Sequence, residues 1–113
     1  MNTKAPSKPA ALEAAATANG FLLDNLPDRY LAVEPQLDAT TKAWRLKVVL
    51  SYPFIGPVGE VGEIVVSAFS EEVLSHTPLP EMRERARQCY EQNREAIQSA
   101  FEQGMKRFDR AVN

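Results

Sequence analysis

Residues 44–52, Trp-Arg-Leu-Lys-Val-Val-Leu-Ser-Tyr, alternate between two kinds of side chain along most of their length. One set is Trp44, Leu46, Val48, Leu50 and Tyr52, and the other is Arg45, Lys47, Val49 and Ser51. Successive side chains of a β-strand point to opposite faces, so this period of two predicts a strand with one buried and one mostly solvated face. We therefore expect a sheet whose core lies on the Trp44 side.

Further extended segments flank this run on both sides. Upstream, residues 30–34 form a short apolar stretch that ends at Pro35 and is followed by turn-forming residues at 38–42. Downstream, residues 63–69 predict a third strand, and residues 73–76 predict a fourth after the polar turn 70–72. These connections are too short for the crossover helices that parallel strands need. The expected sheet is an antiparallel meander of about four strands.

Residues 51–63, Ser-Tyr-Pro-Phe-Ile-Gly-Pro-Val-Gly-Glu-Val-Gly-Glu, read as a shaped connection between two strands. Gly56, Gly59 and Gly62 would supply positive φ or bulges, and the connection would be either a rigid turn or a hinge. A phosphate-binding loop does not fit, because no Lys-Ser or Lys-Thr pair follows and Glu60 and Glu63 would repel an anion. The four residues 56–59 match an RNA-clamping loop only formally, since that loop joins helices.

Two helices are expected outside the sheet. The alanine-rich residues 10–26 favour an N-terminal helix, and residues 1–9 read as a flexible tail. Thr77 as a cap and Pro78 at the first helical position predict a second helix that runs to about Phe108. Its apolar stripe is expected to pack on the Trp44 face; the stripe consists of Met82, Ala86, Cys89 or Tyr90, Ile97, Phe101, Met105 and Phe108. The fold class is therefore α+β, with one domain at residues 10–113.

The composition is typical of an ordinary soluble globular domain. The chain has 113 residues, 44% of them apolar and 25% charged, and its formal net charge is -2. This balance predicts no general attraction to nucleic acid or to an anionic membrane. The single cysteine, Cys89, excludes an internal disulfide and favours a core position. No apolar run is long enough for a membrane helix, so we expect a cytoplasmic location.

The first candidate site is an apolar group on the expected connection. Pro53, Phe54, Ile55 and Val58 place apolar side chains where the chain should lie at the surface. Exposed apolar patches often mark partner-binding surfaces. The alternative, equally weighted, is that Phe54 and Ile55 fold back and cover the core.

A second candidate is a small-ligand pocket near Tyr52, Glu60, Glu63 and His76, between the sheet and the long helix. His76 is the only histidine, so one subunit cannot assemble a multi-histidine metal site or a histidine-based triad pair. We interpret His76 as a hydrogen-bonded structural residue, and we assign no catalytic residue, no metal site and no cofactor.

A third candidate is a basic patch of Arg83, Arg87 and Arg94 on the long helix. A nucleic-acid footprint usually needs a stripe of one sign. Acidic residues interrupt this helix, so a mixed, salt-bridged face is the favoured interpretation; they are Glu81, Glu84, Glu91 and Glu95. Nucleic acid is therefore the least favoured partner.

The block from Trp44 to Tyr90 resembles a group of small prokaryotic single-domain proteins, most familiar from cyanobacteria, that carry no assigned function. The resemblance rests on residues 48–53, 56–63 and 76–78. It implies no catalytic residue for this chain.

Taken together, these observations favour a non-enzymatic protein-interaction or regulatory module that binds a protein partner or itself, with a homodimer expected. An edge strand, residues 53–58 or the C-terminal helix would supply the contact. The alternatives are a small-ligand or metal-binding domain, or a minor enzyme, with its pocket near Tyr52 and His76. A nucleic-acid-binding regulator is the last alternative function.

Overall fold

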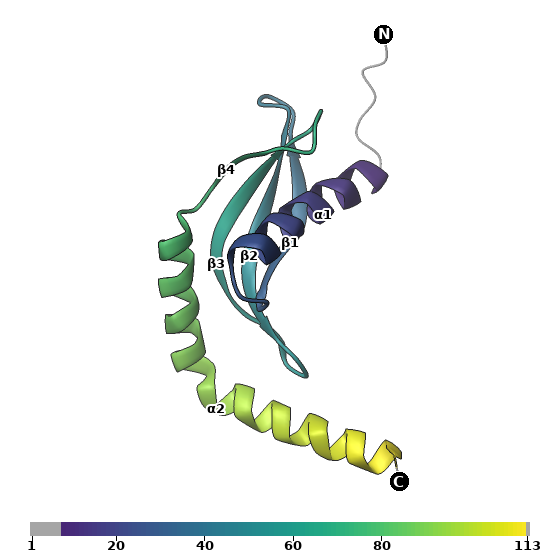
Figure 1. The fold of residues 1–113 in the computed structure, drawn as a ribbon, viewed down its shortest axis with the longest axis vertical. Helices are drawn as coiled ribbons and strands as arrows, with labels where there is room; N and C mark the ends of the chain where they lie inside the picture. Colours follow the sequence, from purple (N-terminus) through teal and green to yellow (C-terminus); the bar gives the residue numbers. More distant parts are fainter. Residues whose placement is uncertain (1–7, 113) are drawn as a thin grey trace.

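The alternating run becomes a central strand of a four-stranded sheet in the computed structural model, which describes the backbone of residues 8–112 and the side chains of residues 10–106. The order along the chain is α1 (Lys8–Asn25), β1 (Tyr30–Asp38), β2 (Ala43–Tyr52), β3 (Gly56–Ser67), β4 (Val73–His76) and α2 (Leu79–Val112). The strands form an antiparallel meander in the order β1-β2-β3-β4 (Figure 1). The predicted α+β fold is confirmed. Most of the tail predicted at residues 1–9 lies outside the described residues, and Lys8 and Pro9 belong to α1.

The core lies between α1 and the Trp44 face of the sheet. Leu46, Val48 and Ile64 are completely or almost completely buried on the sheet side. The α1 side consists of Ala14, Ala18 and Leu22, one residue per turn of helix, and Leu26 follows directly after the helix. Figure 1 shows α1 crossing in front of the sheet. The expectation that the stripe of α2 packs on the Trp44 face is confirmed for its first part, Met82 and Ala86, which belong to the same core cluster; α1 shares this face.

Helix α2 packs over β3, beside α1 on the same face of the sheet. Only two of its side chains, Met82 and Ala86, belong to the buried core cluster. Thr77 was expected to cap this helix, but its Oγ1 accepts a hydrogen bond from the Glu63 backbone N–H at 2.9 Å. The Thr77 N–H donates to the Glu63 carbonyl at 2.9 Å as well. Thr77 therefore continues the contact of β4 with β3 up to the start of α2.

Strand β3 begins at Gly56, so the predicted connection at residues 51–63 is wrong for most of its length. Only residues 53–55 link the strands, and Gly56 takes the positive φ of 84° that the turn requires. Strand β4 pairs only with Ile64–Val66 of β3. At Pro57, the edge of β3 that faces away from β2 therefore has no neighbouring strand. A proline is tolerated there because its missing N–H leaves no ladder bond unmade. Two register shifts between β2 and β3 provide bulges within the strand.

Gly59 and Gly62 allow α2 to approach β3 closely. A Cβ on Gly59 would lie 2.5 Å from the Cys89 Sγ, and a Cβ on Gly62 would lie 3.1 Å from the Met82 Cγ. Neither Gly59 nor Gly62 has a positive φ. Among the glycines of the described chain, only Gly56 has one. The repeated glycines therefore serve two purposes, one turn and two close contacts with the helix.

Strand β1 continues to Asp38, past the end predicted at residue 34. Its pairing with β2 shifts between Val33 and Gln36, and Glu34 has a φ of 54°. This bulge accommodates Pro35 inside an edge strand, where a proline is permitted. The Asp38 carboxylate then accepts the Thr40 N–H at 3.0 Å and shapes the turn into β2.

The side chain of Asn19 ties α1 to the outer edge of β1. Its Oδ1 accepts the Ala32 N–H at 2.8 Å, and its Nδ2 donates to the Ala32 carbonyl at 3.2 Å. Nδ2 also donates to the Ala15 carbonyl at 2.9 Å. The amide thus satisfies both backbone groups of Ala32 that face away from β2, as a neighbouring strand would. This contact also blocks the edge of β1 against pairing with another strand.

Replacing Asn19 with leucine is expected to lower the free energy of unfolding by about 1–3 kcal/mol, because the half-buried Ala32 N–H and C=O lose their partners. The matched control is Asn25→Leu, which removes one exposed bond from Asn25 to the Phe21 carbonyl. Urea denaturation of both variants measures the difference. Equal stability of the two variants would contradict the assigned role of Asn19.

Candidate binding surface

Helix α2 is much longer than the sheet that supports it. Its 34 residues extend about 51 Å at 1.5 Å per residue, whereas the ten residues of β2 extend about 34 Å. Figure 1 shows the first half of α2 beside β3 and the second half turning away below the β2–β3 hairpin. The radius of gyration is 16.8 Å, against about 13 Å for a compact domain of this length. The second half of α2 therefore projects from the body of the fold.

The tip of the β2–β3 hairpin touches this projecting half. Phe54 has a φ of 72°, which is unusual for an aromatic residue, and its ring meets Phe101 edge-on with centroids 5.5 Å apart. Gly104 is buried directly below, and a Cβ at this position would overlap with the Phe54 ring. The glycine thus makes room for the hairpin tip to rest on α2.

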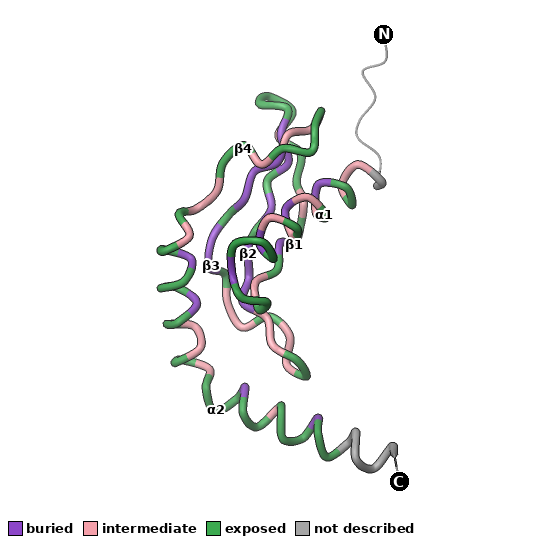
Figure 2. Tube along the Cα trace, in the orientation of Figure 1, coloured by how far each residue is buried: buried purple, intermediate pink, exposed green. Residues whose placement is uncertain are grey.

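Three large apolar side chains remain exposed around this contact. The exposed fractions are 55% for Phe54, 44% for Phe101 and 46% for Met105. We call these three residues the apolar patch. Figure 2 shows that the surrounding turns of α2 are mainly exposed. Met105 lies four residues after Phe101, so the two side chains share one helix face.

A group of tyrosines lies at the end of the core face that α1 leaves uncovered. The rings of Tyr52 and Tyr90 are 6.0 Å apart, and the Arg29 guanidinium lies 5.4 Å from the Tyr52 ring centroid. Burial raises the pKa of Tyr52, and the Tyr90 hydroxyl adds to this rise while Arg29 opposes it. Burial likewise raises the pKa of Tyr30, against the influence of Arg83. Tyr30 and Tyr52 are therefore neutral packing groups at neutral pH.

The four residues predicted to bind a partner lie on or next to the hairpin tip. Pro53 and Phe54 are exposed, whereas Ile55 and Val58 are half-buried, and Val58 packs against the core. The interpretation as an exposed partner-binding surface therefore fits Pro53 and Phe54, and the interpretation as a cover for the core fits Ile55 and Val58. Only Phe54 of the four belongs to the apolar patch.

The four residues predicted around a ligand pocket do not share one space. Glu60 and Glu63 lie on the solvated face, where they contact Lys47 at 3.9 Å and Arg45 at 3.1 Å. Tyr52 and His76 lie on the core side, but His76 pairs with Ile64, which lies opposite Leu46. Leu46 is six residues from Tyr52 along β2, a separation of about 20 Å.

His76 itself has two close neighbours. Its Nδ1 lies 2.7 Å from the Thr77 carbonyl oxygen, and its ring centroid lies 4.8 Å from that of Phe21. These contacts fit a structural histidine that joins β4 to α1.

The arginines of the predicted basic patch have acidic neighbours. Arg87 forms an ion pair with Glu84 at 2.6 Å, and Arg94 lies 3.8 Å from Glu91. The hydrogen bond from Arg87 lowers the pKa of the Glu84 carboxyl. The mixed, salt-bridged face is confirmed for these two arginines, whereas Arg83 lies near Tyr30.

Phe101, Gly104 and Met105 were not assigned to a binding site from the sequence, although two of them appeared in the apolar stripe. A usable signal was present in the length of the predicted helix. A helix from residue 78 to residue 108 extends about 47 Å and exceeds any strand of ten residues. Part of its stripe must therefore project beyond the sheet.

Within the described residues, no three His, Cys, Asp or Glu side chains gather closely enough to hold a metal ion. None of the helices in that part of the chain is long and apolar enough to span a bilayer. Comparison of the chain with protein-family models, with curated proteins and with solved structures found no match. The resemblance of residues 44–90 to small prokaryotic proteins therefore stays a prediction.

Proposed function

We propose that this protein is a non-enzymatic interaction module that forms a homodimer through the second half of α2. The observation that carries the proposal is the apolar patch, in which Phe54, Phe101 and Met105 stay 44–55% exposed although they lie side by side. Exposed apolar residues that gather at one place often mark a surface for another protein. Aromatic residues and methionine are also enriched at such interfaces.

Charge supports a second copy of this chain as the occupant. Residues 91–102 carry an acidic excess from Glu91, Glu95 and Glu102 against Arg94. Residues 103–112 carry a basic excess from Lys106, Arg107 and Arg110 against Asp109. Two such segments related by a two-fold axis perpendicular to the helix run antiparallel, and each acidic part then faces the basic part of its partner. The segment is therefore complementary to itself.

The same arrangement places the apolar patch at the centre of the contact. The acidic and basic parts meet between residues 102 and 103, with Phe101 on one side of this point and Met105 on the other. Interface residues that contribute most of the binding energy tend to cluster at the centre, surrounded by polar contacts. Apolar residues at the middle and charges at the ends match that pattern.

Sedimentation equilibrium of the full chain is expected to give twice the monomer mass of 12.6 kDa. Phe101→Ser should weaken the dimer about 30-fold, since loss of a central interface residue costs about 2 kcal/mol. The matched control is Phe69→Ser, which removes a phenylalanine that is 79% exposed on the β3–β4 loop. That control should remain dimeric. A chain that stays monomeric over the whole accessible concentration range would overturn the proposal.

The antiparallel direction has its own test. Lys106→Glu should weaken the dimer, because the substituted side chain would face the acidic part of the second copy. Arg85→Glu makes the same charge change in the first half of α2 and should leave the dimer unchanged. High salt should weaken the wild-type dimer, as the screening length falls from about 10 Å at 0.1 M to about 3 Å at 1 M. Equal effects of the two substitutions would exclude antiparallel pairing.

A further inference from the structure

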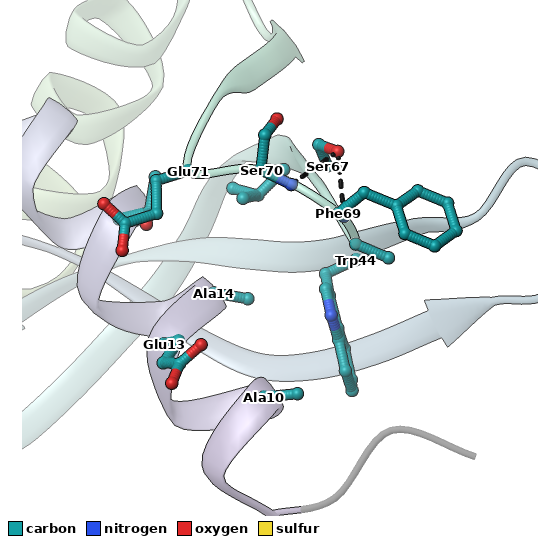
Figure 3. A pocket seen from close by; sticks show the side chains of 11 residues that line it. Ala10, Glu13, Ala14, Trp44, Ser67, Phe69, Ser70 and Glu71 are labelled. Carbon is teal, nitrogen blue, oxygen red and sulfur yellow. Dashed lines mark hydrogen bonds between the residues drawn. The ribbon is translucent and has the colours of Figure 1, made fainter. Parts of the chain in front are cut away.

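A cleft opens at the other end of the molecule, between the start of α1 and the β3–β4 loop. Its volume is about 220 Å³, many times the about 10–15 Å³ that one water molecule needs. Its walls include Glu13 and Thr17 of α1, Trp44 of β2, and Ser67 and Glu71 at the end of β3 and on the loop. Figure 3 shows the carboxylates of Glu13 and Glu71 on one side of the cleft and the Trp44 indole on the other.

The indole of Trp44 carries a polar group that has no partner among the described residues. Trp44 is only 7% exposed and lines the cleft. Its Nε1–H donates no hydrogen bond to any of the described residues, yet none of their fully buried polar atoms is unsatisfied. The indole N–H therefore has no acceptor among the described residues, and the Trp44 side chain lines the cleft (Figure 3). A buried indole normally finds an acceptor, so a ligand here should present one.

The loop that carries Glu71 is held in shape by its own hydrogen bonds. Ser67 Oγ accepts the Phe69 N–H at 3.0 Å and the Ser70 N–H at 3.2 Å. Ser70 Oγ donates to the neighbouring Glu72 carboxylate at 3.1 Å. Glu72 thus has a local partner. By contrast, Glu71 and Glu13 form no ion pair with any side chain that the structure describes.

We infer that this cleft binds an organic cation whose flexible chain also carries a hydrogen-bond acceptor, as in a lysine residue of a peptide. The ammonium group would lie between the Glu13 and Glu71 carboxylates, and an amide carbonyl would accept the Trp44 indole N–H. Two carboxylates disfavour an anion, and the buried donor disfavours a ligand without acceptors. The cleft is far from the apolar patch, so this site is independent of dimer formation.

The single tryptophan of the chain makes the test direct, because Trp44 fluorescence and its one indole ¹H–¹⁵N NMR signal both report on the cleft. The probe is Nα-acetyl-lysine N-methylamide, which carries an ammonium group and two amide carbonyls. We expect a saturable shift of the indole signal that weakens with added salt. The neutral analogue Nα-acetyl-norleucine N-methylamide should produce no saturable shift.

Variants assign the binding to the two carboxylates. The double substitution Glu13→Gln with Glu71→Gln should weaken binding of the lysine probe about threefold to tenfold, in line with two exposed ion pairs. The control, Glu34→Gln with Glu60→Gln, removes two charges from the solvated face of the sheet and should bind the probe unchanged. Butylammonium, which lacks an acceptor, should bind more weakly than the lysine probe. Equally tight butylammonium binding would instead assign the site to free amines.

Two results would overturn the inference. One is an indole signal that does not shift up to the solubility limit of the lysine probe. The other is an equal loss of affinity in both double variants, which would mean that the probe responds only to net charge.

Discussion

Truncating Leu22 to alanine is expected to lower the free energy of unfolding by about 2–5 kcal/mol, the range for removing a fully buried leucine side chain. Leu22 is 1% exposed and belongs to the core cluster that joins α1 to the sheet. The loss of free energy has two parts. One is the transfer free energy of the removed methyl groups, and the other is the cost of the cavity that remains. A domain of this size has only about 5–15 kcal/mol in total, so the variant would lose a large share of its stability.

The neighbouring residue provides a matched control. Leu23 is 64% exposed, so Leu23→Ala should change the free energy of unfolding by no more than about 0.5 kcal/mol. Both substitutions are leucine to alanine in the last two turns of α1, which cancels the difference in helix propensity. Chemical denaturation followed by far-UV circular dichroism measures both values. Equal losses would mean that α1 does not dock on the sheet through the Ala14, Ala18 and Leu22 face.

The sequence was sufficient for the elements but not for the placement of the helices. The alternation from Trp44 to Tyr52 predicted β2 and its buried face because the period of two depends only on local geometry. It does not say which helix covers that face. Both helices pack on it, because α1 contributes Ala14, Ala18 and Leu22 to the core cluster and α2 contributes Met82 and Ala86.

Strand β3 was underestimated for a different reason. Glycine and proline usually interrupt strands, and residues 56–62 contain four of them. In this protein the strand continues through these residues, because two bulges accommodate them and α2 packs against the glycines. The close approach of α2 requires glycine at positions 59 and 62, and this requirement comes from residues 82 and 89, which are 20 and 30 positions away. Local propensities carry no information on such contacts.

The candidate surfaces show the same limit. Phe54 was recognised because an aromatic residue in a turn is conspicuous. Its companions Phe101 and Met105 were assigned to the helix stripe, since periodicity does not show where a supporting sheet ends. The cleft at Trp44 depends on the loop conformation at residues 67–71, which Ser67 sets through bonds to backbone N–H groups.

The contact between β3 and α2 can be tested with a pair of substitutions. Gly59→Ala is expected to lower the free energy of unfolding by about 1–3 kcal/mol, the usual cost of overpacking. The reason is the 2.5 Å separation between the added Cβ and the Cys89 Sγ, which is shorter than any normal contact. Gly20→Ala is the control, since nothing lies within 4 Å of its added Cβ. That substitution in exposed helix should stabilise the protein by up to about 1 kcal/mol.

The second substitution should remove the clash that the first one creates. Without its sulfur, residue 89 presents only its Cβ to the alanine at 59, at an ordinary contact distance of 3.5 Å. Cys89→Ala alone should cost about 1 kcal/mol or less, since it removes one half-buried atom. The double variant should therefore be more stable than the sum of the two single effects predicts, with a coupling energy of about 0.5–3 kcal/mol. Strictly additive effects would mean that the Cys89 side chain turns away freely, and that closeness to α2 does not explain the glycine at position 59.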